Sequence, residues 1–154
     1  MANSPEPKPP CHAEVSVEVE AGAHEVWNAV VNWDIQSTWM LFTKVWPTEN
    51  NGEGIGGKIA ARTGIGPVGF IDDMVITHWE PPLRCRVEHL GKIVRGTGDF
   101  IVAPMAAGTR FTWAEDVIPP FGRFGVAAWP AVRPVFELMM RISVARLAAR
   151  VTPK

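Results

Sequence analysis

The sequence has no tyrosine, only two cysteines and no long apolar run, and each of these shortages is informative. Without tyrosine, large aromatic surface comes from seven tryptophans and seven phenylalanines, which favours an apolar core or pocket. Cys11 and Cys85 are too few for a disulfide framework. Because Cys11 lies in a proline-rich stretch, we predict a reducing, cytoplasmic location. No apolar run approaches the roughly 18 residues of a membrane span, so stable membrane insertion is not expected.

Net charge is also scarce. At −1, the formal charge predicts no attraction to nucleic acid or to a membrane. Residues 121–154 differ from the rest, because six basic residues accompany one acidic residue, Glu137. The basic residues are Arg123, Arg133, Arg141, Arg146, Arg150 and Lys154. Cations late in a helix oppose its macrodipole; the alternative is that this segment binds an anionic group or a partner.

A chain of 154 residues fits one domain that needs no disulfide or metal for stability. Residues 1–12 are rich in proline and lack an apolar core, so we predict a disordered tail. Residues 13–152 then form the single domain. The oligomeric state does not follow from the sequence.

Hydropathy patterns divide this domain into strands and helices. Apolar and polar residues alternate at period two in residues 13–20, which predicts a strand. Helical spacing follows in residues 23–32, and a second short helix is expected over residues 34–39. Further strands are predicted at residues 42–48, 58–63, 68–79, 84–90, 94–102 and 109–117. A short helix at 121–129 and a long one at 131–150 complete the chain, with Pro130 between them and Pro134 in a first turn.

This order predicts an α+β fold, in which a strongly curved antiparallel sheet of about seven strands wraps around the long C-terminal helix. The two short helices after the first strand would close one end of the sheet.

Strand registers were tested by charge pairing. A two-residue turn at Gly91 pairs Leu90 with Ile93, and a four-residue turn at 104–107 places Glu115 opposite Gly96. Both registers bring opposite charges together on one face, which we predict to be the solvent face. The other face is apolar except for His89 and Glu115. Gly96 and Gly98 also lie on it and, lacking side chains, would leave a hollow.

The strand at 68–79 allows two readings. Its even positions, Phe70, Asp72, Met74, Ile76 and His78, face inward if a four-residue turn pairs His78 with Cys85. The odd positions, from Ile71 to Trp79 and including Asp73, face inward otherwise. We prefer the even set.

Glu115 is the sharpest functional candidate, because a carboxyl group in an apolar cavity can act as an acid or a base. Alternatively it is a structural carboxylate, paired with Trp27 or with an arginine of the last helix. The four histidines show no metal-ligand spacing, and Cys85 is interpreted as a small core residue. The glycine-rich segment at 52–58 resembles a phosphate-binding loop but lacks the strand and helix that such loops join. We therefore predict no metal and no cofactor.

Three stretches resemble proteins of the SRPBCC superfamily, which includes START and polyketide cyclase/dehydrase proteins. They are the opening segment at 15–33 (VSVEVEAGAHEVWNAVVNW), Gly98-x-Phe100, and residues 108–115 (GTRFTWAE) followed by Pro119-Pro120 and a terminal helix. The resemblance covers residues 13–151. It implies a helix-grip fold with a deep hydrophobic cavity between the sheet and the last helix, and in the cyclases, polar or acidic side chains within it.

We therefore predict a protein that binds, and in one version transports, a lipid-like or polyketide-like hydrophobic small molecule. The first alternative is a cofactor-independent cyclase or dehydratase with Glu115 and His89 as acid/base groups. The second is a non-catalytic module that binds a partner through the basic helix. The predicted ligand-binding residues are Trp27, Phe70, Asp72, Met74, Ile76, Cys85, Val87, Gly96, Gly98, Phe100, Phe111, Trp113, Phe136, Met139 and Met140.

Overall fold

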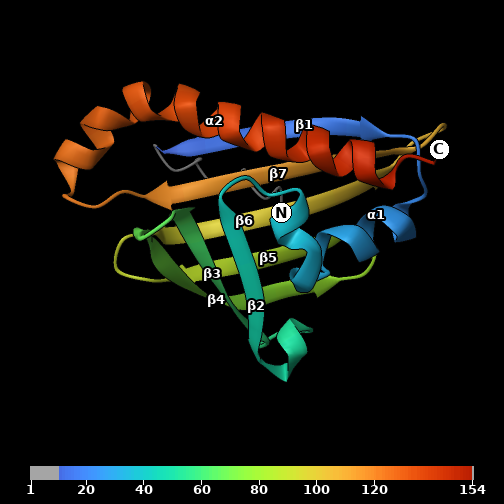
Figure 1. Ribbon diagram of the computed structural model, residues 1–154, viewed down its shortest axis with the longest axis horizontal. Coiled ribbons are helices and arrows are strands. Elements are labelled where there is room, and N and C mark those ends of the chain that lie inside the picture. Colours follow the sequence, from blue (N-terminus) through green and yellow to red (C-terminus); the bar gives the residue numbers. More distant parts are fainter. Residues whose placement is uncertain (1–10, 154) are drawn as a thin grey trace, which may run out of the picture.

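The computed structural model describes residues 11–153, in which seven strands and a long C-terminal helix form one α+β unit (Figure 1). The strands are β1 (His12–Val19), β2 (Thr43–Glu49), β3 (Lys58–Ile65), β4 (Val68–Glu80), β5 (Arg84–Leu90), β6 (Arg95–Pro104) and β7 (Thr109–Ile118). The helices are α1 (Ala23–Val30), α2 (Arg123–Val151) and the short 3-10 turns η1 (Trp33–Thr38) and η2 (Asn50–Gly52). Every predicted strand is present with its ends within two residues of the prediction. Most of the predicted tail, residues 1–10, lies outside the described residues.

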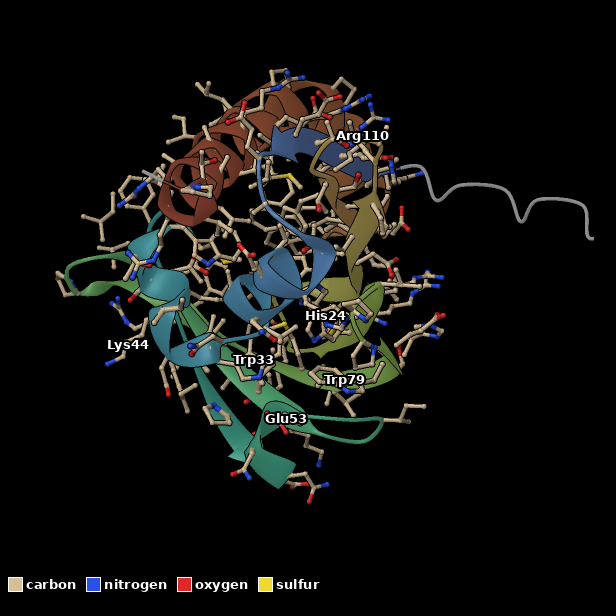
Figure 2. The ribbon with its side chains drawn as sticks, turned by 90° about the vertical axis from the view of Figure 1, so that its right-hand side faces the viewer. His24, Trp33, Lys44, Glu53, Trp79 and Arg110 are labelled. Carbon is tan, nitrogen blue, oxygen red and sulfur yellow. The ribbon has the colours of Figure 1, made fainter. Side chains whose placement is uncertain are left out.

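The strands form one antiparallel sheet in the order β1-β7-β6-β5-β4-β3-β2. The first strand therefore pairs with the last, and α2 packs lengthwise against β1 (Figure 1). Viewed from the side, the sheet curves from β1 beneath α2 round to β2, with α1 and η1 between its two sides (Figure 2). Buried Val26, Trp27 and Val30 fix α1 against the core. The predicted curved sheet around a long C-terminal helix is confirmed.

The final helix is continuous, so the predicted break at Pro130 is wrong. Pro130 and Pro134 both lie inside α2, although proline removes a backbone N–H and disfavours a helix interior. Trp129 explains why the helix persists: its side chain is buried, and its ring centroid lies 6.1 Å from that of Phe136. Tertiary packing here outweighs local propensity.

Two predicted registers are wrong by two residues. Leu90 pairs with Arg95, so the β5–β6 connection has four residues instead of two. Glu115 pairs with Gly98 instead of Gly96. Side chains alternate at period two, so a shift of two residues leaves every side chain on its predicted face. The residues directly opposite one another were therefore misassigned, while the inner face was right. Arg84 still forms the expected ion pair with Asp99, at 2.9 Å, although Asp99 lies opposite Arg86.

Strand β4 turns its even-numbered residues inward, as predicted, only in its first part. Asp72, Met74 and Ile76 are buried, as the even set requires. The register shifts between Ile76 and His78, and beyond this bulge Trp79, not His78, pairs with Cys85. A bulge reverses the faces of a strand. The predicted pairing of His78 with Cys85 is therefore wrong.

Candidate functional site

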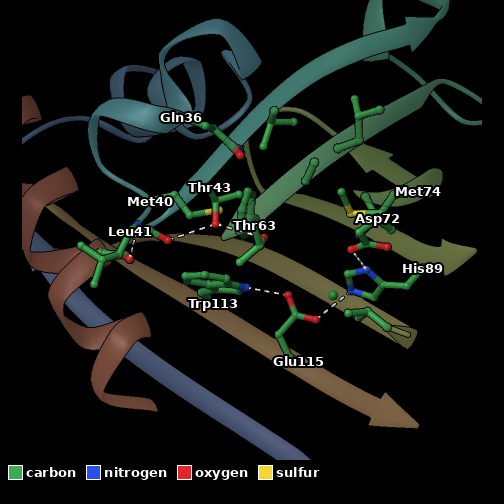
Figure 3. A pocket seen from close by; sticks show the side chains of 18 of the residues that line it. Gln36, Met40, Leu41, Thr43, Thr63, Asp72, Met74, His89, Trp113 and Glu115 are labelled. Atoms are coloured by element: carbon green, nitrogen blue, oxygen red, sulfur yellow. Dashed lines mark hydrogen bonds and ion pairs between the residues drawn. The ribbon is translucent and has the colours of Figure 1, made fainter. Parts of the chain in front are cut away.

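A cavity of about 160 Å³ lies between the concave face of the sheet and α2 (Figure 3). Its walls come from η1, the segment after it, β2 to β7 and the middle of α2. Twelve of the predicted site residues line it: Phe70, Asp72, Met74, Cys85, Val87, His89, Gly98, Phe100, Trp113, Glu115, Phe136 and Met139. The cavity surface is predominantly apolar, as a pocket for a hydrophobic molecule requires.

Five predicted ligand-binding residues do not line the cavity. Trp27, Ile76, Phe111 and Met140 are buried in the core; Trp27 packs edge-on against Trp79 with ring centroids 5.1 Å apart. Gly96 has a φ of +112°, and a Cβ there would lie 1.9 Å from the carbonyl oxygen of Asp116. This glycine is therefore required by the backbone, and only Gly98 leaves space beside the cavity.

Other lining residues were not among the predicted site residues. They are Trp33, Gln36, Met40, Leu41, Thr43, Val45, Ile59, Ala61, Thr63, Val94, Val117 and Ser143. Val94 and Val117 share the predicted inner face of their strands, which was a usable signal. Most of the others come from η1, β2 and β3, whose inner faces the patterns did not assign.

The charged part of the wall is a hydrogen-bonded cluster centred on His89. Its Nδ1 lies 2.7 Å from Asp72 Oδ2 on β4, and its Nε2 lies 2.9 Å from Glu115 Oε2 on β7. The indole Nε1–H of Trp113 donates to Glu115 Oε1 at 2.8 Å. The side chains of His89, Asp72 and Glu115 are 7%, 8% and 11% exposed. Glu115 is therefore paired, but with His89 and Trp113 instead of Trp27 or an arginine.

Gly98 allows this cluster to form across β6. His89 on β5 and Glu115 on β7 belong to strands that both flank β6, and Gly98 is the direct partner of Glu115. A Cβ at position 98 would lie 2.8 Å from Glu115 Oε1 and 3.0 Å from Oε2. The missing side chain gives the carboxylate the room to reach the imidazole.

The two carboxylates keep His89 protonated. Burial by itself lowers the pKa of His89, but hydrogen bonds and charges from Asp72 and Glu115 outweigh it and raise the pKa from 6.5 to about 10. The ring is therefore an imidazolium at neutral pH, and both of its N–H groups are committed to carboxylates. Asp72 Oδ1 is buried without a hydrogen-bond partner in the described structure.

The remaining polar groups of the cavity are neutral. Gln36 on η1 donates its Nε2–H to the carbonyl of Val30 at 2.8 Å. Ser143 Oγ on α2 accepts the backbone N–H of Leu41 at 2.9 Å and donates to the carbonyl of Met139. The hydrogen bond between Leu41 and Ser143 joins the segment before β2 to α2, on the side of the cavity opposite the cluster (Figure 3).

Cys85, itself a small buried residue, also lies on the cavity wall. Burial, together with the negative charge of Asp99, raises the pKa of its thiol from 9.0 to about 12. A thiol with such a pKa forms almost no thiolate at neutral pH, so it is a poor nucleophile. Among the described residues, no group of His, Cys, Asp and Glu side chains is placed to hold a metal ion. Within residues 11–153, no helix has the length and apolar character needed to cross a bilayer.

Comparison with known proteins identifies relatives of this fold. Residues 10–152 match the profile of the family described as polyketide cyclase / dehydrase and lipid transport. No curated protein sequence matches the chain.

Three solved structures illustrate the likeness. CV1439 of Chromobacterium violaceum has a TM-score of 0.72 at 15% identity, covering 93% of this chain and 99% of its own. TTHA0849 of Thermus thermophilus has a TM-score of 0.70 at 14% identity, covering 91% and 96%. Cgl2372 of Corynebacterium glutamicum, described as Polyketide_cyc-like, has a TM-score of 0.59 at 16% identity, covering 86% and 89%. At these identities the likeness is one of fold.

Proposed function

Because the chain belongs to the polyketide cyclase/dehydrase and lipid transport family of the SRPBCC superfamily, we propose that it binds a hydrophobic small molecule in the cavity beneath α2. The observation that carries this proposal is the composition of the cavity wall. Aromatic and aliphatic side chains make up most of it, and the charged groups are confined to one cluster. Apolar walls bind a ligand by removing its surface from water, and a few polar groups orient it.

A lipid-like or polyketide-like ligand, and its transport, are the finer parts of this proposal. At about 160 Å³ the cavity is smaller than the roughly 300–1,000 Å³ typical of ligand pockets, so it suits a small ligand or one part of a larger ligand. A reducing, cytoplasmic location agrees with the free thiols of Cys11 and Cys85.

Ligand retention tests the proposal. The purified protein is analysed by native mass spectrometry, and its organic extract is compared with that of an Ala61→Phe variant. Ala61 lines the cavity, so the phenyl ring should fill it and abolish retention. Ala103→Phe is the matched control, because Ala103 is exposed on β6. Absence of any ligand from the wild type, or equal retention by both variants, would contradict the proposal.

Acid/base catalysis by Glu115 and His89, as in a cyclase or dehydratase, is a second candidate. The buried Asp72–His89–Glu115 cluster at the cavity wall favours it. Since His89 is already protonated at neutral pH, the basic oxygens are those of the carboxylates. Turnover of a polyketide substrate should fall in Glu115→Gln and His89→Ala and persist in His78→Ala, whose imidazole pairs with exposed Glu80. Unchanged turnover in the first two variants would end this reading.

Partner binding through the basic helix remains a third prediction. The outer side of α2 exposes Phe124, Val135 and Leu138 beside its arginines. The substitutions Arg141→Glu and Arg150→Glu should weaken the capture of a partner that binds this side of α2. Unchanged capture would contradict the prediction of partner binding.

A further inference from the structure

The cluster on the cavity wall is rich in hydrogen-bond acceptors and has no donor to spare. Its donors are the two N–H groups of His89 and the indole N–H of Trp113, and each is bonded to a carboxylate oxygen. The acceptors are four carboxylate oxygens: Asp72 Oδ1 is fully buried and receives no hydrogen bond, and the other three accept one hydrogen bond each and keep a lone pair for another. A ligand that meets this wall must therefore bring a donor.

Charge leads to the same conclusion. Two carboxylates flank a single imidazolium, so the cluster has one negative charge in excess and is nine-tenths buried. A buried charge without a partner is costly, and a cation placed beside it recovers part of that cost. A ligand carboxylate would face only acceptors and add a second negative charge.

The size of the cavity limits the rest of the ligand. Its volume of about 160 Å³ is close to that of an engineered cavity of about 150 Å³ that holds one benzene ring. Phe100 and Trp113 supply aromatic surface on the same wall as Glu115. A single ring with a short side chain therefore fits a space of this size. Figure 3 shows Trp113 beside Glu115, next to the cluster with His89 and Asp72.

We propose that the ligand is a single-ring apolar molecule carrying a protonated amine, with the ring in the cavity and the ammonium group at the carboxylates of Asp72 and Glu115. This inference rests on the proposed function and names the chemical class of its ligand.

Three probes of matched size separate the ligand classes. Phenethylamine, 2-phenylethanol and phenylacetate share the ring and chain length and end in a cation, a neutral hydroxyl and an anion. An alkylammonium with a pKa near that of lysine, about 10.4, is fully charged at pH 7. We expect calorimetric titration to give a dissociation constant about 10-fold lower for phenethylamine than for 2-phenylethanol, because charged hydrogen bonds are stronger than neutral ones. Phenylacetate should not bind measurably.

Substitution of Asp72 tests whether its carboxylate causes the preference for the amine over the alcohol. In Asp72→Asn, whose side chain keeps its shape but loses its charge, the advantage of the amine should fall below about 3-fold, because the cluster is then neutral. Asp73→Asn is the matched control, since Asp73 is the next residue of β4 but is exposed on its outer face. Glu115→Gln is a second test if Asp72→Asn does not fold, which circular dichroism will establish.

Several outcomes would overturn the inference. Equal affinity for amine and alcohol would do so while leaving the proposed function in place, because the alcohol would still occupy the cavity. Tighter binding of phenylacetate would reverse the charge argument. An amine preference that survives in Asp72→Asn, or is lost in Asp73→Asn, would place the amine elsewhere. Failure of all three probes would refute the size argument, while ligand retention by the wild type would still decide the proposed function.

Discussion

Raising the pH from 7 to 10 is expected to destabilise the protein by removing the proton that His89 holds between Asp72 and Glu115. The pKa of His89 is raised to about 10 in the folded state from its ordinary value of 6.5. Folding therefore favours proton binding. The resulting stabilisation is complete below pH 6.5 and is lost as the pH rises through 10.

The magnitude follows from this window. A pKa difference contributes about 1.4 kcal/mol per pH unit, so the whole interval from 6.5 to 10 is worth on the order of 5 kcal/mol. Roughly 3 to 4 kcal/mol of it should be lost between pH 7 and pH 10. Small domains are stable by only about 5–15 kcal/mol, so the melting temperature should fall by about 10 °C.

Urea unfolding followed by tryptophan fluorescence at pH 6, 7, 8, 9 and 10 measures the effect. The matched variant is His89→Gln, which has no titrating group at this position. The Cys85 thiol also lowers the free energy of unfolding above pH 9, because it ionises in the unfolded chain while burial keeps it protonated in the folded one. This occurs in both proteins, so the difference between their curves isolates His89. The wild-type free energy of unfolding should fall toward that of the variant as the pH rises. Parallel curves from pH 7 to pH 10 would refute the reasoning.

Two further predictions concern the same wall. Gly98→Ala should lower the free energy of unfolding by about 1–3 kcal/mol, because the new Cβ would lie 2.8 Å from Glu115 Oε1. The cost should be smaller in a Glu115→Ala background; an equal cost there would show that this contact is not the cause. In a Cys11→Ser background, Cys85 should react with a disulfide reagent only after urea unfolding, because the residue is 2% exposed and burial raises the pKa of its thiol to about 12. Equal rates with and without urea would contradict its burial.

Patterns within single strands predicted most of the fold. Alternation identified the face that β5, β6 and β7 turn inward, because side chains follow a period of two whatever the neighbouring strand is. For this reason His89, Glu115 and Phe100 were correctly predicted on the inner face, and they line the cavity, although two registers were misassigned.

Interruptions of a pattern were harder to predict. The bulge between Ile76 and His78 reverses β4 without a glycine or proline at that point to announce it. Pro130 was expected to end a helix, but the buried ring of Trp129 holds α2 together across it. Gln36 and Met40 line the cavity from η1 and the turn after it, where no regular period assigns a face.

The sequence alone determined the element order, the apolar inner face and the presence of His89 and Glu115 on it. It did not determine that Glu115 lies opposite Gly98, or that Asp72 completes the cluster from β4. Periodicity describes each strand separately, whereas a hydrogen bond between residues 17 or 26 positions apart depends on how neighbouring strands align and how the sheet bends. Only the folded sheet brings these three side chains together, because the cavity and its charged wall are properties of that alignment.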